Sequence, residues 1–378
     1  MTIERLEVFA LNYTFSPARG PSIAYGNAYA YAVVRITDTD GVVGWGETYL
    51  LPGLTGIIEA VAPILIGRKA SDALDLKQAI WKSAEHPYAS SAISIALDDL
   101  RARQAGVPIY ALYGGAQRTR VRAYAAIGGY VEGVGPERTW PNETEQLAAS
   151  GYTAIKLRIG RYPLAHERPL YEQIRRDLPA SVDLMADGNG GYTLRRAIET
   201  GRVLDDLGFL WFEEPLHQWD GYVGYDVLHR SMDIALAGGE ITLSRNAARE
   251  FVDNSKADIF QPEPVICGGI SETLFYASLA RLNAMSCVPH TSGGAIGIAS
   301  ALQVIAALPD PTRLPLHDLP FLEVGSDPNP WRTDMFRTPL RQKNGWVDVP
   351  TGPGLGFEVD EAFVRRRASE VRVVMNTA

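Results

Sequence analysis

Three carboxylates in the second half of the chain each close a short apolar run, and they recur at nearly constant spacing. Asp187 ends Val-Asp-Leu-Met-Ala-Asp, Glu213 ends Phe-Leu-Trp-Phe-Glu, and Glu240 ends Ile-Ala-Leu-Ala-Gly-Gly-Glu. The segment between one acid and the next has about the length of one strand plus one helix. On neighbouring strands of a parallel barrel the three acids would meet at one rim and repel one another unless a cation lay between them. The pattern therefore predicts a site for a hard, oxygen-binding ion such as Mg²⁺.

Two cations lie on another apolar run, Ala154-Ile-Lys-Leu-Arg-Ile. Because side chains alternate along a strand, the apolar residues would face the surrounding helices, and Lys156 and Arg158 would face the barrel interior. Unpaired cations are costly there, and two interpretations remain open. In one, the two cations belong to a structural ion-pair network. In the other, Arg158 lowers the pKa of Lys156 so that the lysine can accept a proton as a base.

A histidine and a glutamate are expected at the ends of two later runs. Ala284-Met-Ser-Cys-Val-Pro-His delivers His290 to the same rim, and Asp258-Ile-Phe-Gln-Pro-Glu places Glu263 at the adjacent strand end. A carboxylate beside a histidine fixes its tautomer and stabilises the imidazolium form. The pair therefore favours a proton-transferring histidine over a structural one.

Three further positions leave alternatives open. Strand alternation does not decide between Glu213 and Glu214 as the acid that faces the ion, because both sides of that run are apolar. Asn189 either hydrogen-bonds a substrate carboxylate or simply forms the turn in Asp-Gly-Asn-Gly-Gly. Glu323, in the last apolar run, either donates a hydrogen bond to a forming enolate or is a solvated surface residue.

The N-terminal third has the pattern of a small antiparallel sheet followed by helices. Alternating runs lie at residues 6–10, 29–37 and 42–48, and Asp38-Thr-Asp-Gly predicts a hairpin turn between the last two. Helical periodicity follows at residues 55–65, 73–84 and 90–104. Two loops, residues 15–26 and 49–56, border the strands.

From about Arg120 short apolar runs alternate with helix-length amphipathic segments. The runs are Val121–Ile127, Ala154–Ile159, Val182–Asp187, Phe209–Glu213, Ile234–Ala237, Ala257–Gln261, Ala284–Pro289 and Leu319–Val324. Eight such runs predict an α/β fold of the closed parallel barrel (TIM barrel) type. A doubly wound open sheet is the alternative, but it would not gather eight strand ends around one point. We expect three parts: residues 1–119, the barrel at 120–340, and a C-terminal segment at 341–378 that returns to the first part.

Composition limits the classes of partner. The net charge of −8 and the pI of about 5.4 argue against binding to nucleic acid or to a membrane surface. The sequence has no apolar run near 18 residues and begins without the features of a signal peptide. Its two cysteines, Cys267 and Cys287, are expected to be buried small hydrophobes in a cytoplasmic protein.

In order along nearly its whole length, the sequence resembles the enolase superfamily, and within it the mandelate racemase subgroup of the mandelate racemase / muconate lactonizing enzyme family. Residues 238–301 are most similar to enzymes of the galactarolactone cycloisomerase type. The resemblance is carried by Gly44-Trp-Gly-Glu47, Lys156-Leu-Arg158, Asp187-Gly-Asn189, Trp211-Phe-Glu213-Glu-Pro, Gly238-Gly-Glu240, Gln261-Pro-Glu263, Cys267-Gly-Gly-Ile, Pro289-His290 and Gly352-Pro-Gly-Leu-Gly-Phe-Glu.

The resemblance implies an α+β capping domain over a modified (β/α)₇β barrel, and Mg²⁺ held by Asp187, Glu213 and Glu240. It is the main reason for choosing Glu213 over Glu214. It also implies that the carboxylate of a small substrate binds the ion and loses its α-proton to a base on the second or seventh strand. The two loops of the capping domain would close over the substrate. Members of the family commonly form homo-oligomers.

Two departures from the family pattern shape the expected reaction. The usual second lysine is Arg158 here, and a guanidinium is a poor base. The histidine's partner is Glu263 where the subgroup usually has aspartate. We therefore expect a lyase that dehydrates an acid sugar, with His290 as principal base or acid and Glu263 holding it. Lys156 and Arg158 would be electrostatic partners, with Lys156 a possible second base. The alternatives are an isomerase (a racemase, an epimerase or a sugar-lactone cycloisomerase) and, more remotely, a non-catalytic metal-binding barrel.

Overall fold

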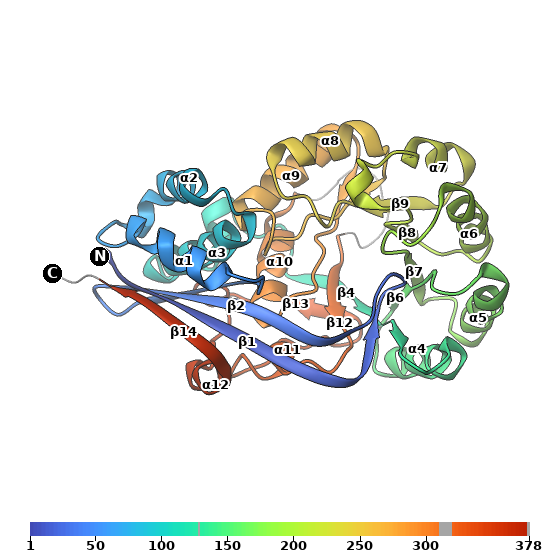
Figure 1. Ribbon diagram of the computed structural model, residues 1–378, viewed down its shortest axis with the longest axis horizontal. Helices are drawn as coiled ribbons and strands as arrows, with labels where there is room; N and C mark the ends of the chain where they lie inside the picture. Colours follow the sequence, from blue (N-terminus) through green and yellow to red (C-terminus); the bar gives the residue numbers. More distant parts are fainter. Residues whose placement is uncertain (128, 310–319, 376–378) are drawn as a thin grey trace.

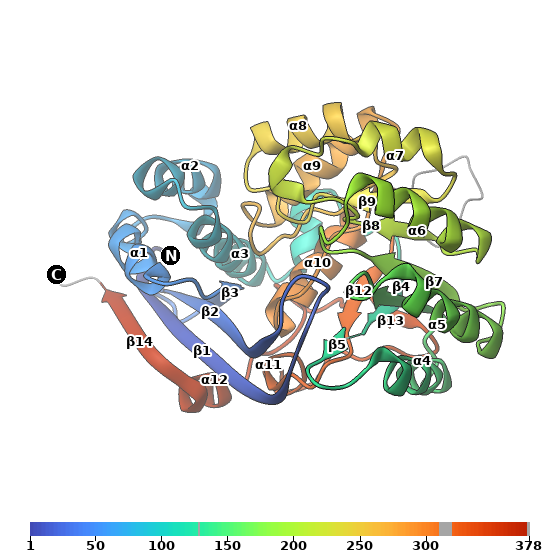
Figure 2. The same ribbon diagram turned by 45° about the vertical axis from the view of Figure 1, so that its right-hand side comes forward.

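The computed structural model describes residues 1–127, 129–309 and 320–375 (Figure 1). An antiparallel sheet with its helices lies beside a barrel of parallel strands and surrounding helices. Figure 2 shows the helices of the barrel arranged around its strands. No helix among the described residues has the length and apolar character needed to cross a membrane.

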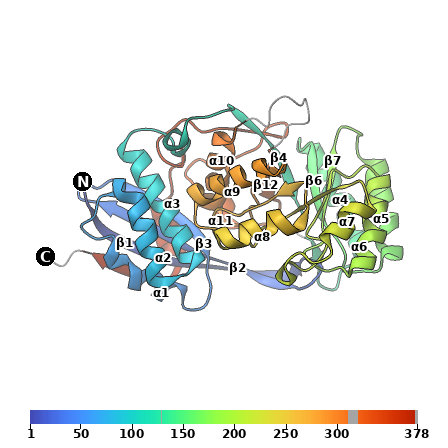
Figure 3. The same cartoon turned by 90° about the horizontal axis from the view of Figure 1, so that it is seen from above.

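The antiparallel sheet contains β1 (Ile3–Gly20), β2 (Gly26–Asp38), β3 (Val43–Tyr49) and β14 (Ala368–Met375), in the order β14-β1-β2-β3. The predicted hairpin turn joins β2 to β3, and the Asp38 carboxylate accepts the backbone N–H groups of Asp40 and Val42 at 3.0 and 2.9 Å. Three helices cover one face: α1 (Leu54–Val61), α2 (Ala73–Ala84) and α3 (Pro87–Gln104) (Figure 3). A Cβ atom at Gly46 would lie 1.9 Å from Ala92 O on α3, so glycine permits this close packing.

The first strand is longer than predicted. Residues 15–20 were expected to belong to a loop, but β1 continues to Gly20 because Arg19 and Gly20 pair with the short strand β5 (Tyr130–Val131). Only residues 21–25 are left to connect β1 and β2. This extension carries the sheet across to the barrel, as Figure 2 shows.

Eight parallel strands of the barrel are found among the described residues, one in each predicted run. They are β4 (Arg120–Ala126), β6 (Ala154–Arg158), β7 (Asp183–Asp187), β8 (Trp211–Glu213), β9 (Ala235–Gly238), β10 (Ile259–Phe260), β11 (Ser286–Cys287) and β12 (Leu322–Gly325). Leu319, at the start of the last run, lies outside the described residues. Seven helices connect them: α4 (Trp140–Ala149), α5 (Leu164–Asp177), α6 (Leu194–Asp206), α7 (Tyr225–Ser231), α8 (Arg245–Ser255), α9 (Ile270–Leu282) and α10 (Ala295–Ala307).

This is the predicted (β/α)₇β arrangement. From β4 to β11 each barrel strand pairs with the next one along the chain, and β4 also pairs with the last strand, β12. The Thr291 backbone N–H and hydroxyl donate to Glu323 Oε2 at 3.1 Å and to Glu323 O at 2.7 Å, which joins the segment after β11 to β12. Tyr124, Trp211 and Phe321 fill the interior with edge-to-face ring contacts at 5.5–6.1 Å. The interior is therefore packed, and a site can form only at the mouth.

The C-terminal tail contacts both parts. β13 (Trp346–Asp348) pairs with β4 of the barrel, while α12 (Glu361–Arg367) leads into β14, which pairs with β1. The remaining short elements are α11 (Pro330–Thr333) and the 3₁₀ turns at Ala62–Ile64, Ala70–Asp72, Ile109–Tyr113, Pro136–Arg138 and Gln218–Asp220.

Candidate active site

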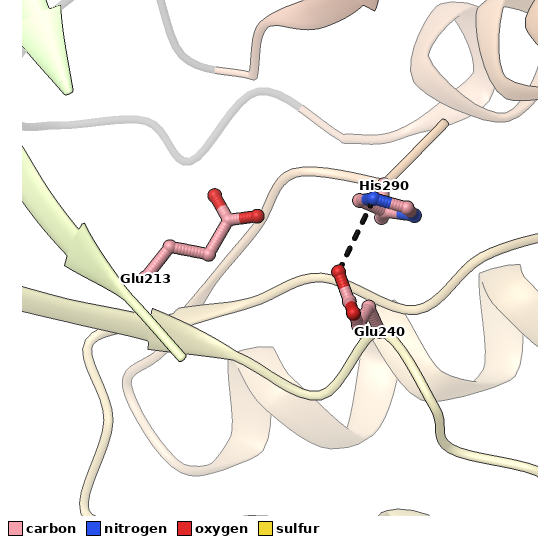
Figure 4. A group of neighbouring side chains, drawn as sticks. All are labelled: Glu213, Glu240 and His290. Carbon is pink, nitrogen blue, oxygen red and sulfur yellow. Dashed lines mark ion pairs between the residues drawn. The ribbon is translucent and has the colours of Figure 1, made fainter. Parts of the chain in front are cut away.

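The three acids lie at the carboxyl ends of neighbouring strands. Asp187 ends β7, Glu213 ends β8 directly beside it, and Glu240 follows β9 by two residues. One ligand atom each from Glu213, Glu240 and His290 lies within 4.8 Å of the others (Figure 4). Asp187 is oriented differently, since the Asn189 backbone N–H and Nδ2 donate to its two oxygens at 2.8 and 2.9 Å.

The structure distinguishes the two consecutive glutamates. Glu213 points into the barrel, where Gln261 Nε2 donates to it at 2.8 Å and Trp211 Nε1 at 3.1 Å. Glu214 points away from the cavity and accepts the Gly239 N–H at 2.7 Å and the Tyr225 hydroxyl at 3.0 Å. Glu213 is therefore the one that can bind an ion there.

Lys156 is fully buried in a cluster of carboxylates. Its Nζ lies 2.5 Å from Glu213, 2.9 Å from Glu323 and 3.8 Å from Asp187. Burial alone lowers the pKa of Lys156, but the charges of Glu213 and Glu323 outweigh it and hold the pKa well above the usual lysine value. The prediction that Arg158 makes Lys156 a base is wrong, because carboxylates surround the lysine and keep it protonated. The ion-pair interpretation describes this residue.

Arg158 reaches toward the cavity from the end of β6. Its Nε lies 4.0 Å from Asp187 Oδ2 and makes no hydrogen bond to the described residues. Burial alone lowers the pKa of Arg158, but the Asp187 charge outweighs it, and the net shift is upward. Arg158 is therefore a fixed positive charge at the mouth of the barrel.

The predicted histidine–glutamate pair is present. His290 Nδ1 lies 2.9 Å from Glu263 Oε2, so the longer side chain of glutamate reaches the ring. On the other side, His290 Nε2 lies 3.2 Å from Glu240 Oε2. Burial alone lowers the pKa of His290, but the surrounding carboxylates, led by Glu240, outweigh it and raise the pKa well above its usual value. These carboxylates therefore favour the imidazolium form of His290, a form that can donate a proton.

Glu323 behaves differently from both predicted alternatives. It is 1% exposed, so it is not a solvated surface residue. Burial alone raises the pKa of Glu323, but Lys156 and His290 outweigh it and bring the pKa to about 2. An ionised carboxylate accepts hydrogen bonds, and the prediction that Glu323 donates one to an enolate is wrong for that reason.

Asn189 combines its two alternatives. Its backbone is left-handed, with φ of 46°, as expected for an asparagine in a turn. Its side-chain nitrogen holds Asp187, whereas Oδ1 is buried without a hydrogen bond among the described residues and borders the cavity. The free oxygen can accept a bond from a ligand hydroxyl.

The sequence did not reveal a set of contacts from the end of β3 that holds the catalytic segments. We call Glu47, Thr48 and Tyr49 the β3 clasp. Glu47 accepts the Gly294 N–H at 2.6 Å, Thr48 donates to Val265 O at 2.6 Å, and Tyr49 donates to Glu263 Oε1 at 2.5 Å. The sheet thus fixes both segments that carry the histidine pair. The Gly44-Trp-Gly-Glu47 motif was the only sequence signal for it.

The cavity over these residues has a volume of about 460 Å³, and both parts of the chain line it. The sheet contributes the residues around Arg19 and Tyr25, as well as Tyr49. Arg19 Nη1 lies 3.2 Å from Asp327, and Arg332 donates to the backbone oxygens of the segment that follows His290. A small polar acid fits a cavity of this size and charge pattern.

The donor set fits a divalent cation. Five carboxylates (Asp187, Glu213, Glu240, Glu263 and Glu323) surround three cationic side chains (Lys156, Arg158 and His290). One ion such as Mg²⁺ would neutralise the two excess negative charges. Burial is the main cause that raises the pKa values of Asp187 and Glu213, a sign that their charge is incompletely compensated. Glu240 Oε2 is also buried without a hydrogen bond among the described residues.

Two family models match the chain. Residues 141–363 match a model described as Enolase C-terminal domain-like, and residues 11–114 match the mandelate racemase / muconate lactonizing enzyme N-terminal domain. Together they cover most of the sheet with its helices and most of the barrel.

Individual relatives extend over nearly the same range. The chain is 33% identical over 344 residues to D-galactarolactone cycloisomerase of Agrobacterium fabrum, which covers 88% of this chain and 89% of that protein. It is 29% identical over 337 residues to arabinonate dehydratase of Saccharolobus solfataricus, with 86% and 87% covered. Among solved structures, the 3,6-anhydro-D-galactonate cycloisomerase from Zobellia galactanivorans matches with a TM-score of 0.86 at 27% identity, over 98% of this chain and all of that one.

Proposed function

The chain belongs to the mandelate racemase / muconate lactonizing enzyme family of the enolase superfamily and is therefore an enzyme, and we propose that it dehydrates an acid sugar. The substrate would be an aldonic or aldaric acid, from which the enzyme removes the proton next to the carboxylate with the help of Mg²⁺. The observation that carries the proposal is His290, held between Glu263 at 2.9 Å and the acids of the ion site at 3.2 Å.

The difficulty of the reaction lies in the charge that develops on the substrate. An α-proton beside a carboxylate is a weak acid, because its loss adds a second negative charge to the same group. Each 1.36 kcal/mol of stabilisation of that charge is about a factor of ten in rate. Mg²⁺ held by Asp187, Glu213 and Glu240 would neutralise these acids and supply positive charge to the substrate carboxylate.

The chain's own residues supply the rest. Lys156, fixed as an ammonium by Glu213 and Glu323, places positive charge beneath the developing ene-diolate. A divalent cation at the acids would offset part of the negative charge that favours the imidazolium, and His290 in its neutral form would accept the α-proton at Nε2, the nitrogen that faces the cavity, while Glu263 holds Nδ1. The protonated ring then donates that proton to the departing β-hydroxyl, which leaves as water and gives an enol that becomes the keto acid. Thus one histidine serves both steps.

Elimination is favoured over racemisation because the second strand offers no neutral base. Racemisation needs a proton acceptor on each face of the α-carbon, whereas Lys156 is held as an ammonium and Arg158 is a guanidinium. Cycloisomerisation of a sugar lactone is the second candidate. It is supported by the 33% identity to the Agrobacterium fabrum relative that carries that name.

A substrate panel separates these reactions. Aldonic acids, aldaric acids and their lactones are incubated with Mg²⁺ or with EDTA in D₂O and followed by proton NMR. Dehydration gives a keto acid only when Mg²⁺ is present. Deuterium entering the α-position without a keto product contradicts dehydration and supports an epimerase, and conversion of a lactone alone supports the cycloisomerase. No change in any of these compounds would contradict all three reactions.

A further inference from the structure

The antiparallel sheet has one uncovered edge. β14 pairs with β1 on one side, and no strand of the described residues pairs with its other side. Figures 1 and 2 show α12 only at the start of β14, and no helix along the rest of that edge. The strand at the other end, β3, packs against α3 and α10. A free edge exposes unpaired N–H and C=O groups, which can bind another strand.

The sequence of β14 does not protect this edge. Its eight residues, Ala-Ser-Glu-Val-Arg-Val-Val-Met, include no proline and no lysine, the residues that commonly block edge pairing. Val371, Val373 and Met375 share one face and are 42%, 42% and 52% exposed. The opposite face packs toward α1, where Arg372 Nη1 lies 2.6 Å from Glu59.

We propose that β14 pairs antiparallel with β14 of a second copy of this chain, so that the two sheets become one continuous sheet. The proposal does not depend on the reaction that the enzyme catalyses. A two-fold axis perpendicular to the sheet keeps α1 of both copies on the same face, and each residue then pairs with a residue of the same face.

Charge selects the register, and with it a second copy as the partner. With the axis at Val371, near the middle of the strand, Glu370 lies opposite Arg372 of the other copy, and this favourable pair occurs twice. With the axis at Glu370 or at Arg372, like charges face each other. An axis at Val373 would leave only the last five residues of the strand to pair. The strand is thus complementary to itself in the register that also pairs nearly its whole length.

The first test is the mass of the full chain in solution, measured by light scattering after gel filtration. We expect an even multiple of 41.3 kDa for the unchanged protein, and half that mass for Val371→Lys, which brings two like charges together at the axis. Leu282→Lys is the matched control, because this α9 residue is 84% exposed and should leave the mass unchanged. A monomeric unchanged protein, or a Val371→Lys variant of unchanged mass, would overturn the proposal.

The second test determines the register of the β14–β14 pairing with cysteine variants that leave the strand intact. Val371→Cys places two cysteines within disulfide reach across the axis, whereas in Val373→Cys they are separated by four residues along the strand, about 14 Å. Under mild oxidation, the first variant should form a covalent dimer on a non-reducing gel and the second should not. The unchanged protein shows how much covalent dimer forms through Cys267 and Cys287 alone. Equal cross-linking of the two variants, or none in either, would contradict pairing at Val371.

Discussion

Glu47 should make the stability of the protein depend on pH in a way that one substitution removes. This β3 clasp residue is fully buried, and its Oε2 makes no hydrogen bond to the described residues. Burial is the main cause that raises the pKa of Glu47 from 4.5 to about 7. The folded state therefore binds the proton more tightly than the unfolded state. Below about pH 4.5 Glu47 is protonated in both states and does not lower the free energy of unfolding. The free energy of unfolding then falls as the pH rises toward 7.

The size of the effect follows from the shift. At about 1.36 kcal/mol per pKa unit, a rise from 4.5 to about 7 corresponds to about 3 kcal/mol. Glu47→Gln cannot ionise and keeps an oxygen that can accept the Gly294 N–H. Its free energy of unfolding should therefore gain about 3 kcal/mol relative to the unchanged protein between pH 4.5 and pH 8. Effects of the new amide that do not vary with pH cancel in this comparison.

Urea unfolding followed by tryptophan fluorescence at pH 4.5, 6, 7 and 8 and constant ionic strength measures the difference. Glu4→Gln, at an exposed position of β1 in the same sheet, is the control and should show a flat difference. A flat difference for Glu47→Gln as well would refute the reasoning, because it would mean that the helix N-terminus at Gly294 keeps the carboxylate ionised despite its burial.

Three further predictions concern the barrel mouth. Tyr49→Phe removes the donor to Glu263 Oε1 and should lower kcat about tenfold or more with little change in melting temperature; an unchanged kcat would exclude a positioning role. Lys156→Met leaves Glu213 and Glu323 without their cation and should destabilise the protein by about 3–5 kcal/mol, with part of the loss recovered by Mg²⁺ in calorimetric scans. A loss of stability that Mg²⁺ does not alter would argue against an ion in contact with these acids. His290→Asn should lower kcat by at least about 10²-fold in the keto-acid assay while the variant still unfolds at a similar temperature, and a nearly unchanged rate would remove His290 from the mechanism.

The parts of the fold that depend on local pattern were predictable. Each of the eight apolar runs overlaps a barrel strand, and Asp38 stabilises the expected hairpin turn with its own carboxylate. The pairing of Glu263 with His290 followed from adjacent strand ends. These features need only residues that are close in the chain, or strands that are neighbours in a parallel barrel.

What escaped prediction depends on contacts between distant segments. Gly20 continues β1 because β5, more than a hundred residues later, pairs with it, and Tyr49 reaches Glu263 across a separation of 214 residues. The pKa of Lys156 was predicted with the wrong sign because strand alternation showed its neighbour Arg158 but not the carboxylates that surround its Nζ. The protonation state of a side chain depends on all the charged groups around the cavity, and the pattern of a single strand does not show them.

The central claim is that an ion is held by the acids and that His290 remains free for proton transfer. A crystal grown with Mn²⁺ in place of Mg²⁺ and measured at a wavelength where manganese scatters anomalously tests it directly. We predict one anomalous peak in contact with the carboxylates of Asp187, Glu213 and Glu240, with His290 Nε2 beyond bonding distance. A peak bonded to His290 together with Glu213 and Glu240, the three groups that already lie within 4.8 Å of one another, would contradict the account.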